Sequence, residues 1–194
     1  PGDFVSEAEM FADREQHLAA VRAMFEGLDV LVFTLGLTEC WRSKSDGAVF
    51  PLCPGVAGGH FDENRYEFYN QRVQDAHADL NAFLLRLAQV NPRASVVLTV
   101  SPVPLVATAQ PGAHVLSATT YSKSVLRVAA DMVCNEHPNV HYFPSYEIIS
   151  NAYNRGAYYG ENLRDVVEDG VSHVMRVFFA NATNIEASQN SRPG

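Results

Sequence analysis

Helical and strand-like patterns of hydrophobic residues alternate along the chain. Residues 6–28 carry apolar side chains at roughly helical spacing, and Ser6 with Glu9 makes a capping-box pattern at their start. The following run, residues 29–36, is short, continuously apolar and β-branched, which predicts a strand buried on both faces. The chain therefore begins with a predicted helix that leads directly into a buried strand.

The same alternation continues to residue 180. The pattern predicts further helices at 66–90, 119–136 and 170–180 and further strands at 95–100 and 140–143. Residues 43–64 and 153–162 lack periodicity and are predicted loops. Strands that alternate with helices predict an α/β domain over residues 1–180, a parallel sheet with helices on both faces. Residues 181–194 are rich in Asn and Ser and are predicted to be a flexible tail or linker.

Composition excludes several classes of function. The chain has 194 residues, of which 47% are hydrophobic and 19% charged, as in globular proteins. A net charge of -8 without any Lys/Arg run argues against nucleic-acid binding, and no apolar stretch approaches the roughly 20 residues of a membrane span. Cys40, Cys53 and Cys134 form no CxxC pair, so we expect neither a metal site nor disulfides. These features predict a cytoplasmic protein with reduced thiols and no cofactor.

The carboxyl ends of the predicted strands are where a ligand site is expected in a parallel sheet. After the first strand, Gly36 lets backbone approach a ligand closely, and its N–H is a candidate oxyanion donor. Thr38 and Glu39 add a hydroxyl and a carboxylate. The competing interpretation is a turn whose polar side chains simply face water.

Two serine-containing segments are candidates for nucleophilic chemistry. Ser101 follows the strand at 95–100, but prolines end that strand and the Gly-x-Ser-x-Gly elbow is missing, which favours a structural role. Lys123 lies among serines at the start of a predicted helix, an arrangement compatible with Ser/Lys catalysis. Such pairs are also frequent on solvated helix starts, and that interpretation is favoured.

Histidine and aromatic residues supply the remaining candidates. His173 follows Asp169 by four residues, a spacing that permits a same-face Asp/His pair, and His60 in the long loop is the next candidate base. Tyr142 and Tyr146 flank the end of the last strand and are suited either to a sugar or acyl pocket or to the core.

Four blocks of sequence together resemble the GSCFA family. The blocks are Thr34-Leu35-Gly36-Leu37-Thr38-Glu39-Cys40-Trp41, Leu98-Thr99-Val100-Ser101-Pro102-Val103-Pro104-Leu105, Tyr121-Ser122-Lys123-Ser124-Val125-Leu126-Arg127 and Tyr142-Phe143-Pro144-Ser145-Tyr146-Glu147. The resemblance runs from about Gly2 to Ala180. This family is named for a Gly-Ser-Cys-Phe-Ala motif near its N-terminus and looks distantly similar to the GDSL/SGNH lipases and esterases.

The resemblance implies a three-layer, flavodoxin-like (SGNH-type) domain with a serine nucleophile after its first strand. The Gly-Ser-Cys-Phe-Ala segment has no counterpart here, so the expectation is a domain that is incomplete at its N-terminus and lacks its first strand. A separate N-terminal segment or chain would then complete the sheet.

The resemblance also assigns roles to individual residues. Gly36, Thr38 and Glu39 fall on the oxyanion positions, although a carboxylate at Glu39 replaces the usual amide. The catalytic Asp-x-x-His pattern is replaced by Glu161 and Arg164, and arginine is no base near neutral pH. The remaining candidates are His173 as the base with Asp169 or Glu161 as its orienting carboxylate, and Trp41, Ser101, Tyr142 and Tyr146 as substrate-binding residues.

Two functions follow from these observations. The first is a serine esterase or O-acyltransferase of SGNH type that acts on a small-molecule or carbohydrate substrate bearing an acyl group. The alternative is a catalytically silent binding or structural module that keeps the SGNH-like fold. Whether a histidine lies within hydrogen-bond reach of the nucleophile distinguishes them.

Overall fold

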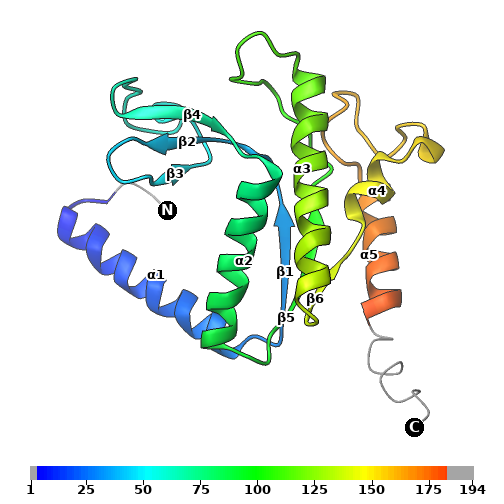
Figure 1. The fold of residues 1–194 in the computed structure, drawn as a ribbon, viewed down its shortest axis with the longest axis horizontal. Coiled ribbons are helices and arrows are strands. Elements are labelled where there is room, and N and C mark those ends of the chain that lie inside the picture. Colours follow the sequence, from blue (N-terminus) through cyan, green and yellow to red (C-terminus); the bar gives the residue numbers. More distant parts are fainter. Residues whose placement is uncertain (1–3, 183–194) are drawn as a thin grey trace.

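The computed structural model describes residues 4–182 and has an α/β fold. Its central sheet contains β1 (Val30–Leu35), β5 (Ser95–Val100) and β6 (Val140–Tyr142), all parallel and in the order β1-β5-β6 (Figure 1). The β-branched runs that predicted these strands supply the sheet's interior, where Val96, Leu98 and Val100 are fully buried. The α/β class and the parallel sheet predicted from the sequence are therefore confirmed.

Helices cover both faces of this sheet (Figure 1). These helices are α2 (Val73–Val90), α3 (Val115–Glu136), α4 (Ser145–Ser150) and α5 (Glu168–Ala182), with a 3-10 turn at Ala152–Asn154. The helix α1 (Glu7–Gly27) contacts α2 and has no buried residue. Leu80 of α2 and Leu126 of α3 lie over the face that carries Phe33, whereas α4 and α5 lie over the face that carries Val32. These three layers are consistent with a flavodoxin-like layout.

A second, antiparallel sheet differs from the prediction. It contains β2 (Glu39–Ser43), β3 (Val49–Phe50) and β4 (Tyr66–Asn70), in the order β3-β2-β4. The sequence pattern placed 66–70 in a helix and 43–64 in a loop. Pairing with β2, including an edge-to-face contact of Trp41 with Phe68, overrides the helical pattern there. The helix α2 begins only after Arg72, whose N–H donates to Asp75.

The helix α1 has the start that its sequence predicts but little packing. The Ser6 hydroxyl accepts a hydrogen bond from Glu9 N at 3.2 Å, so the predicted cap is confirmed. No described residue of α1 is buried. Its C-terminal end is fixed instead by Asn91, whose amide donates to the carbonyls of Phe25 and Leu28.

The strand β1 lies at the edge of the central sheet, contrary to the prediction that both its faces are buried. Val30, Val32 and Phe33 are 55%, 52% and 41% exposed. The sequence pattern predicted this apolar strand correctly, but it could not show which elements neighbour the strand in the fold. At the other end of the chain, Asn181 and Ala182 belong to α5, and the rest of the predicted tail lies outside the described residues.

Candidate functional site

The turn after β1 is held by buried polar side chains from other elements. The carbonyl of Gly36 accepts a hydrogen bond from Lys123 Nζ at 2.8 Å. The backbone N–H of Thr38 donates to Ser122 Oγ at 2.7 Å, and the Thr38 hydroxyl donates to Asn70 Oδ1 at 2.6 Å. Thr38 and Lys123 are each only 1% exposed. The turn at the carboxyl end of β1 is therefore anchored to α3 and β4.

Lys123 is the unexpected member of this cluster. Its sequence context favoured a solvated helix start, yet the side chain is buried and burial lowers its pKa to about 8. Lys123 was a disfavoured candidate in the sequence, whereas Ser122 and Asn70 were not proposed as site residues, and the structure brings all three to the turn. The one available signal was that Ser122 keeps helical spacing with Ala118 and Val125, which marks the buried face of α3.

Position 36 does not require a glycine for steric reasons in this structure. Its backbone φ is not in the left-handed region, and a Cβ added there would meet nothing within 4 Å. There is thus open space beside the Cα atom of Gly36, and another group can approach the backbone there.

Glu39 binds a loop rather than standing free at the turn. One of its carboxylate oxygens accepts a hydrogen bond from Thr108 Oγ1 at 2.5 Å, and the other accepts from Ala109 N at 3.1 Å. Both donors lie in the segment between β5 and α3. Glu39 therefore ties the loops after β1 and β5 together at the carboxyl end of the sheet.

Trp41 and Ser101 take part in local structure. The ring of Trp41 packs edge-to-face on Phe68 of β4 at a centroid distance of 5.6 Å and on Phe61 of the loop before β4 at 5.2 Å. Ser101 Oγ accepts from Val103 N at 3.2 Å, a turn within its own loop. The hydroxyl of Ser145, which the sequence did not single out, instead contacts Thr99 Oγ1 and donates to the Val100 carbonyl.

Tyr142 and Tyr146 pack against the hydrophobic core. The Tyr142 hydroxyl donates to Glu147 at 2.9 Å, and the Arg127 guanidinium lies 4.1 Å from the centre of its ring. Burial, together with the Glu147 carboxylate, raises the pKa of Tyr142 well above its usual range. This arrangement has the character of a half-buried structural cluster of α3, β6 and α4.

His173 lies on α5 beside Tyr158. Its Nδ1 is 2.7 Å from the Tyr158 hydroxyl, and the two rings meet edge-to-face. Asp169 and Glu161 are exposed, and neither forms a hydrogen bond or ion pair with His173 in the described part of the chain. The nearby Tyr159 hydroxyl donates to the Pro102 carbonyl at 3.0 Å, which ties this segment to the carboxyl end of β5. The structure thus brings His173 together with Tyr158 and not with the two predicted carboxylates.

Within residues 4–182, the outer edge of β1 has backbone groups that pair with no other strand. The carbonyls of Asp29 and Leu35 accept hydrogen bonds from Ser95 N and Ser101 N, so alternate residues from 29 to 35 face β5. The backbone groups of the residues between them, Val30, Val32 and Thr34, therefore face away from the sheet. They form an edge that is ready to pair with another strand.

Apolar clefts lie on both sides of β1. On one face a cleft of about 480 Å³ is lined by Val32 and Thr34 together with α4 and α5 residues such as Ile149 and Phe178. On the other face Phe33 and Leu35 line a cleft of about 270 Å³ with α2 and α3 residues.

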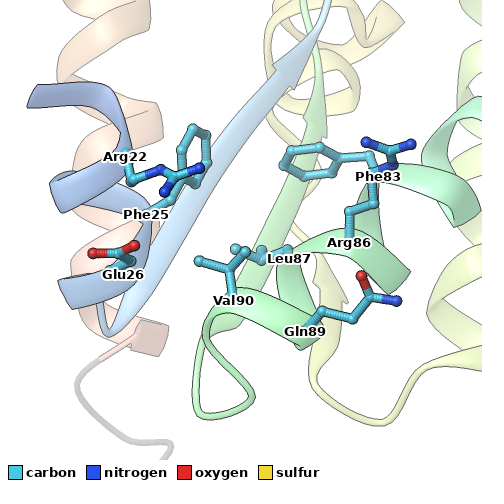
Figure 2. Close-up of a pocket in the computed structure, with 8 residues that line it drawn as sticks. All are labelled: Arg22, Phe25, Glu26, Phe83, Arg86, Leu87, Gln89 and Val90. Atoms are coloured by element: carbon cyan, nitrogen blue, oxygen red, sulfur yellow. The ribbon is translucent and has the colours of Figure 1, made fainter. Parts of the chain in front are cut away.

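A third pocket of about 550 Å³ separates α1 from α2. Figure 2 shows Phe25 of α1 and Phe83 of α2 extending toward one another across it, with Leu87 and Val90 along the α2 side. The side chains of Arg22 and Arg86 stand at its flanks (Figure 2). The first two clefts thus place apolar side chains on both faces of β1.

Residues 4–182 were also compared with the requirements of membrane spans and metal sites, and they meet neither. None of their helices combines the length and the apolar character needed to cross a membrane. No group of three or more His, Cys, Asp or Glu side chains within them is arranged to hold a metal ion.

The fold and the turn after β1 define an α/β domain with its candidate site at the carboxyl end of a parallel sheet. The family model for the GSCFA family matches residues 4–178, and the chain belongs to that family. The resemblance seen in the sequence is therefore confirmed at the level of the family. A search of curated proteins found no match to the chain.

Proposed function

We propose that this domain is part of a serine esterase or O-acyltransferase of SGNH type that acts on an acylated polar substrate such as a carbohydrate ester. The observation that carries the proposal is the turn from Gly36 to Thr38, which buried side chains hold at the carboxyl end of β1. A fixed backbone turn at this edge is suited to stabilising the oxyanion of acyl transfer.

The nucleophile of this proposal comes from a further strand that pairs with β1. A separate N-terminal segment or chain that carries the Gly-Ser-Cys-Phe-Ala motif would bring its serine beside Gly36. The free backbone groups of Val30, Val32 and Thr34 and the apolar clefts on both faces of β1 support such a strand, because they offer it hydrogen bonds and burial.

The proposed base is His173. His173 acts as a base in the tautomer whose Nδ1–H donates to the Tyr158 hydroxyl oxygen, because Nε2 is then unprotonated and can accept the proton of the serine. Tyr158 then orients the ring, the role proposed from the sequence for Asp169 or Glu161. An imidazole oriented by a hydroxyl rather than a carboxylate gains less stabilisation of its protonated form, so slower catalysis than in Asp/His enzymes is expected.

Hydrolysis of p-nitrophenyl acetate by the full-length protein tests the proposal. Replacing His173 by Ala should lower kcat by about 10²- to 10⁴-fold, because a general base is removed. The matched control is His17→Ala, which changes an exposed histidine on α1 and should leave kcat unchanged. Full activity in His173→Ala would move the base elsewhere, with His60 the next residue to replace.

The second candidate function is a catalytically silent binding or structural module. Arg164 at the position of the family's base favours it, as do the exposed Asp169 and Glu161, which form no hydrogen bond or ion pair with His173 within residues 4–182. Absence of hydrolysis of any short-chain ester by the full-length wild type would favour this module over the enzyme.

A further inference from the structure

Lys123 is a buried cation whose partner is a backbone carbonyl. Its side chain donates to the Gly36 carbonyl, and Lys123 forms no ion pair within residues 4–182. The other lysine of the chain, Lys44, also donates to a carbonyl, that of Glu63, but it does so at the exposed surface. Burying an ammonium group without a neighbouring carboxylate is unfavourable. The hydrogen bond to the Gly36 carbonyl is therefore the interaction that accounts for a lysine at this buried position.

The bond to Lys123 fixes the direction of the next N–H. The carbonyl of Gly36 and the N–H of Leu37 belong to one trans peptide group, and in such a group they point in opposite directions. Because the carbonyl points at α3, the Leu37 N–H points away from it. Within the described part of the chain this N–H has no hydrogen-bond acceptor, whereas the N–H of Thr38 is bonded to Ser122.

We infer that Lys123 is a positioning residue that presents the Leu37 N–H as a donor to an oxyanion at the carboxyl end of β1. The cation also polarises the peptide group, since a hydrogen bond to a carbonyl strengthens the donor on the same amide. Lys123 is itself buried, so it acts through the peptide and touches no ligand. Leu37 is 38% exposed, so this residue lies at the surface of the described structure.

This inference rests on the proposed acyl-transfer function, because a tetrahedral oxyanion is the species that such a donor stabilises. It adds a donor whose position depends on the backbone turn and on α3. The carboxylate of Glu39, which would repel an oxyanion, is directed instead to Thr108 and Ala109.

Titration of the ¹⁵N-labelled full-length protein with methylphosphonate, a stable tetrahedral anion, tests the inference. In the wild type the Leu37 amide signal should shift saturably, and the Thr38 amide signal should shift less because its N–H is already bonded. Lys123→Met should weaken methylphosphonate binding by about tenfold or more, and Lys123→Arg, which keeps a cationic donor, should recover part of it. Lys44→Met is the matched control and should bind as the wild type does.

An unmoved Leu37 amide in the wild type would overturn the inference without recourse to any variant, even if Lys123→Met fails to fold. Wild-type affinity in a folded Lys123→Met protein would overturn it equally. Ester hydrolysis is measured on the same samples. If the protein hydrolyses esters but the Leu37 amide signal does not shift, only the positioning role of Lys123 is refuted. If the signal shifts but no ester is hydrolysed, the esterase proposal is refuted, and the Leu37 N–H remains an anion donor.

Discussion

Buried polar side chains decide the local geometry of the candidate site. Ser122, Lys123 and Asn70 come from α3 and β4, yet all contact the short turn after β1. The sequence favoured a solvated position for Lys123, because Ser/Lys pairs are frequent on exposed helix starts. Its partner, the Gly36 carbonyl, lies 87 residues earlier in the chain and could not be inferred from the sequence around Lys123.

Stability should depend on pH through Lys123. The folded protein holds this lysine with a pKa of about 8, below the value of 10.5 for a free side chain. Between these values the unfolded chain binds more protons, so the free energy of unfolding rises with pH. The destabilisation by the buried charge is thus at its full value below pH 8, where Lys123 is protonated in the folded protein. It has disappeared above about pH 10.5, where the lysine is neutral in both the folded and the unfolded state.

Relative to the wild type, Lys123→Met should therefore lose up to about 3 kcal/mol of stability between pH 8 and pH 10.5, since one pKa unit corresponds to about 1.4 kcal/mol. Urea unfolding at a series of pH values measures this difference. Lys44→Met, an exposed control, should track the wild type throughout, and parallel curves for Lys123→Met and wild type would contradict the prediction.

Elements with strong periodicity were predicted well from the sequence. The strand β5 has the predicted bounds, and α3 and β1 differ from theirs by a few residues at their ends. The failure lies at Tyr66–Asn70, where an apparent helical pattern forms β4. Those five residues pair with β2, and the hydrogen bonds and aromatic contacts of that pairing outweigh intrinsic helix preference.

The packing of α5 should depend on Gly170 in its first turn. A Cβ at this position would meet Tyr158 Cβ and Val166 Cγ1 at 3.0 Å and Ile149 Cδ1 at 3.1 Å. Gly170→Ala should therefore destabilise the protein by roughly 1–3 kcal/mol, although alanine is the better helix former.

The matched control is Gly27→Ala at the end of α1, where an added Cβ meets nothing within 4 Å. This change should be neutral or stabilising by up to about 1 kcal/mol. Chemical denaturation of both variants measures the contrast. Equal stabilities would show that α5 moves to accommodate the extra methyl group.

At the scale of the whole molecule, the central sheet ends at an apolar strand. Val30, Val32 and Phe33 of β1 are 55%, 52% and 41% exposed, and α1 contacts α2 through Phe25 and Phe83 beside an open pocket (Figure 2). Natural sheet edges are commonly protected by charge or proline, and β1 contains neither. The edge therefore has the properties of an interior strand, which supports the proposed pairing with a further strand.

A charged side chain at Val32 tests this proposal in the full-length protein. If a further strand and its covering layer bury this position, Val32→Glu should destabilise the protein by about 3–5 kcal/mol through an unpaired buried carboxylate. It should also abolish ester hydrolysis. Val56→Glu, at an exposed loop position 71% accessible, should change the free energy of unfolding by less than about 0.5 kcal/mol. Similar urea midpoints for the two variants would argue that the β1 edge stays free.

The sequence by itself determined the α/β class, the parallel strands and their helices, and the family, because periodicity and motif order are local properties of the chain. It also directed attention to the turn at Gly36. Only the tertiary structure decided that β1 is an edge strand, that residues 66–70 form a strand, and that His173 contacts Tyr158 rather than Asp169. These outcomes depend on contacts between residues far apart in the chain, and such contacts leave no trace in local periodicity.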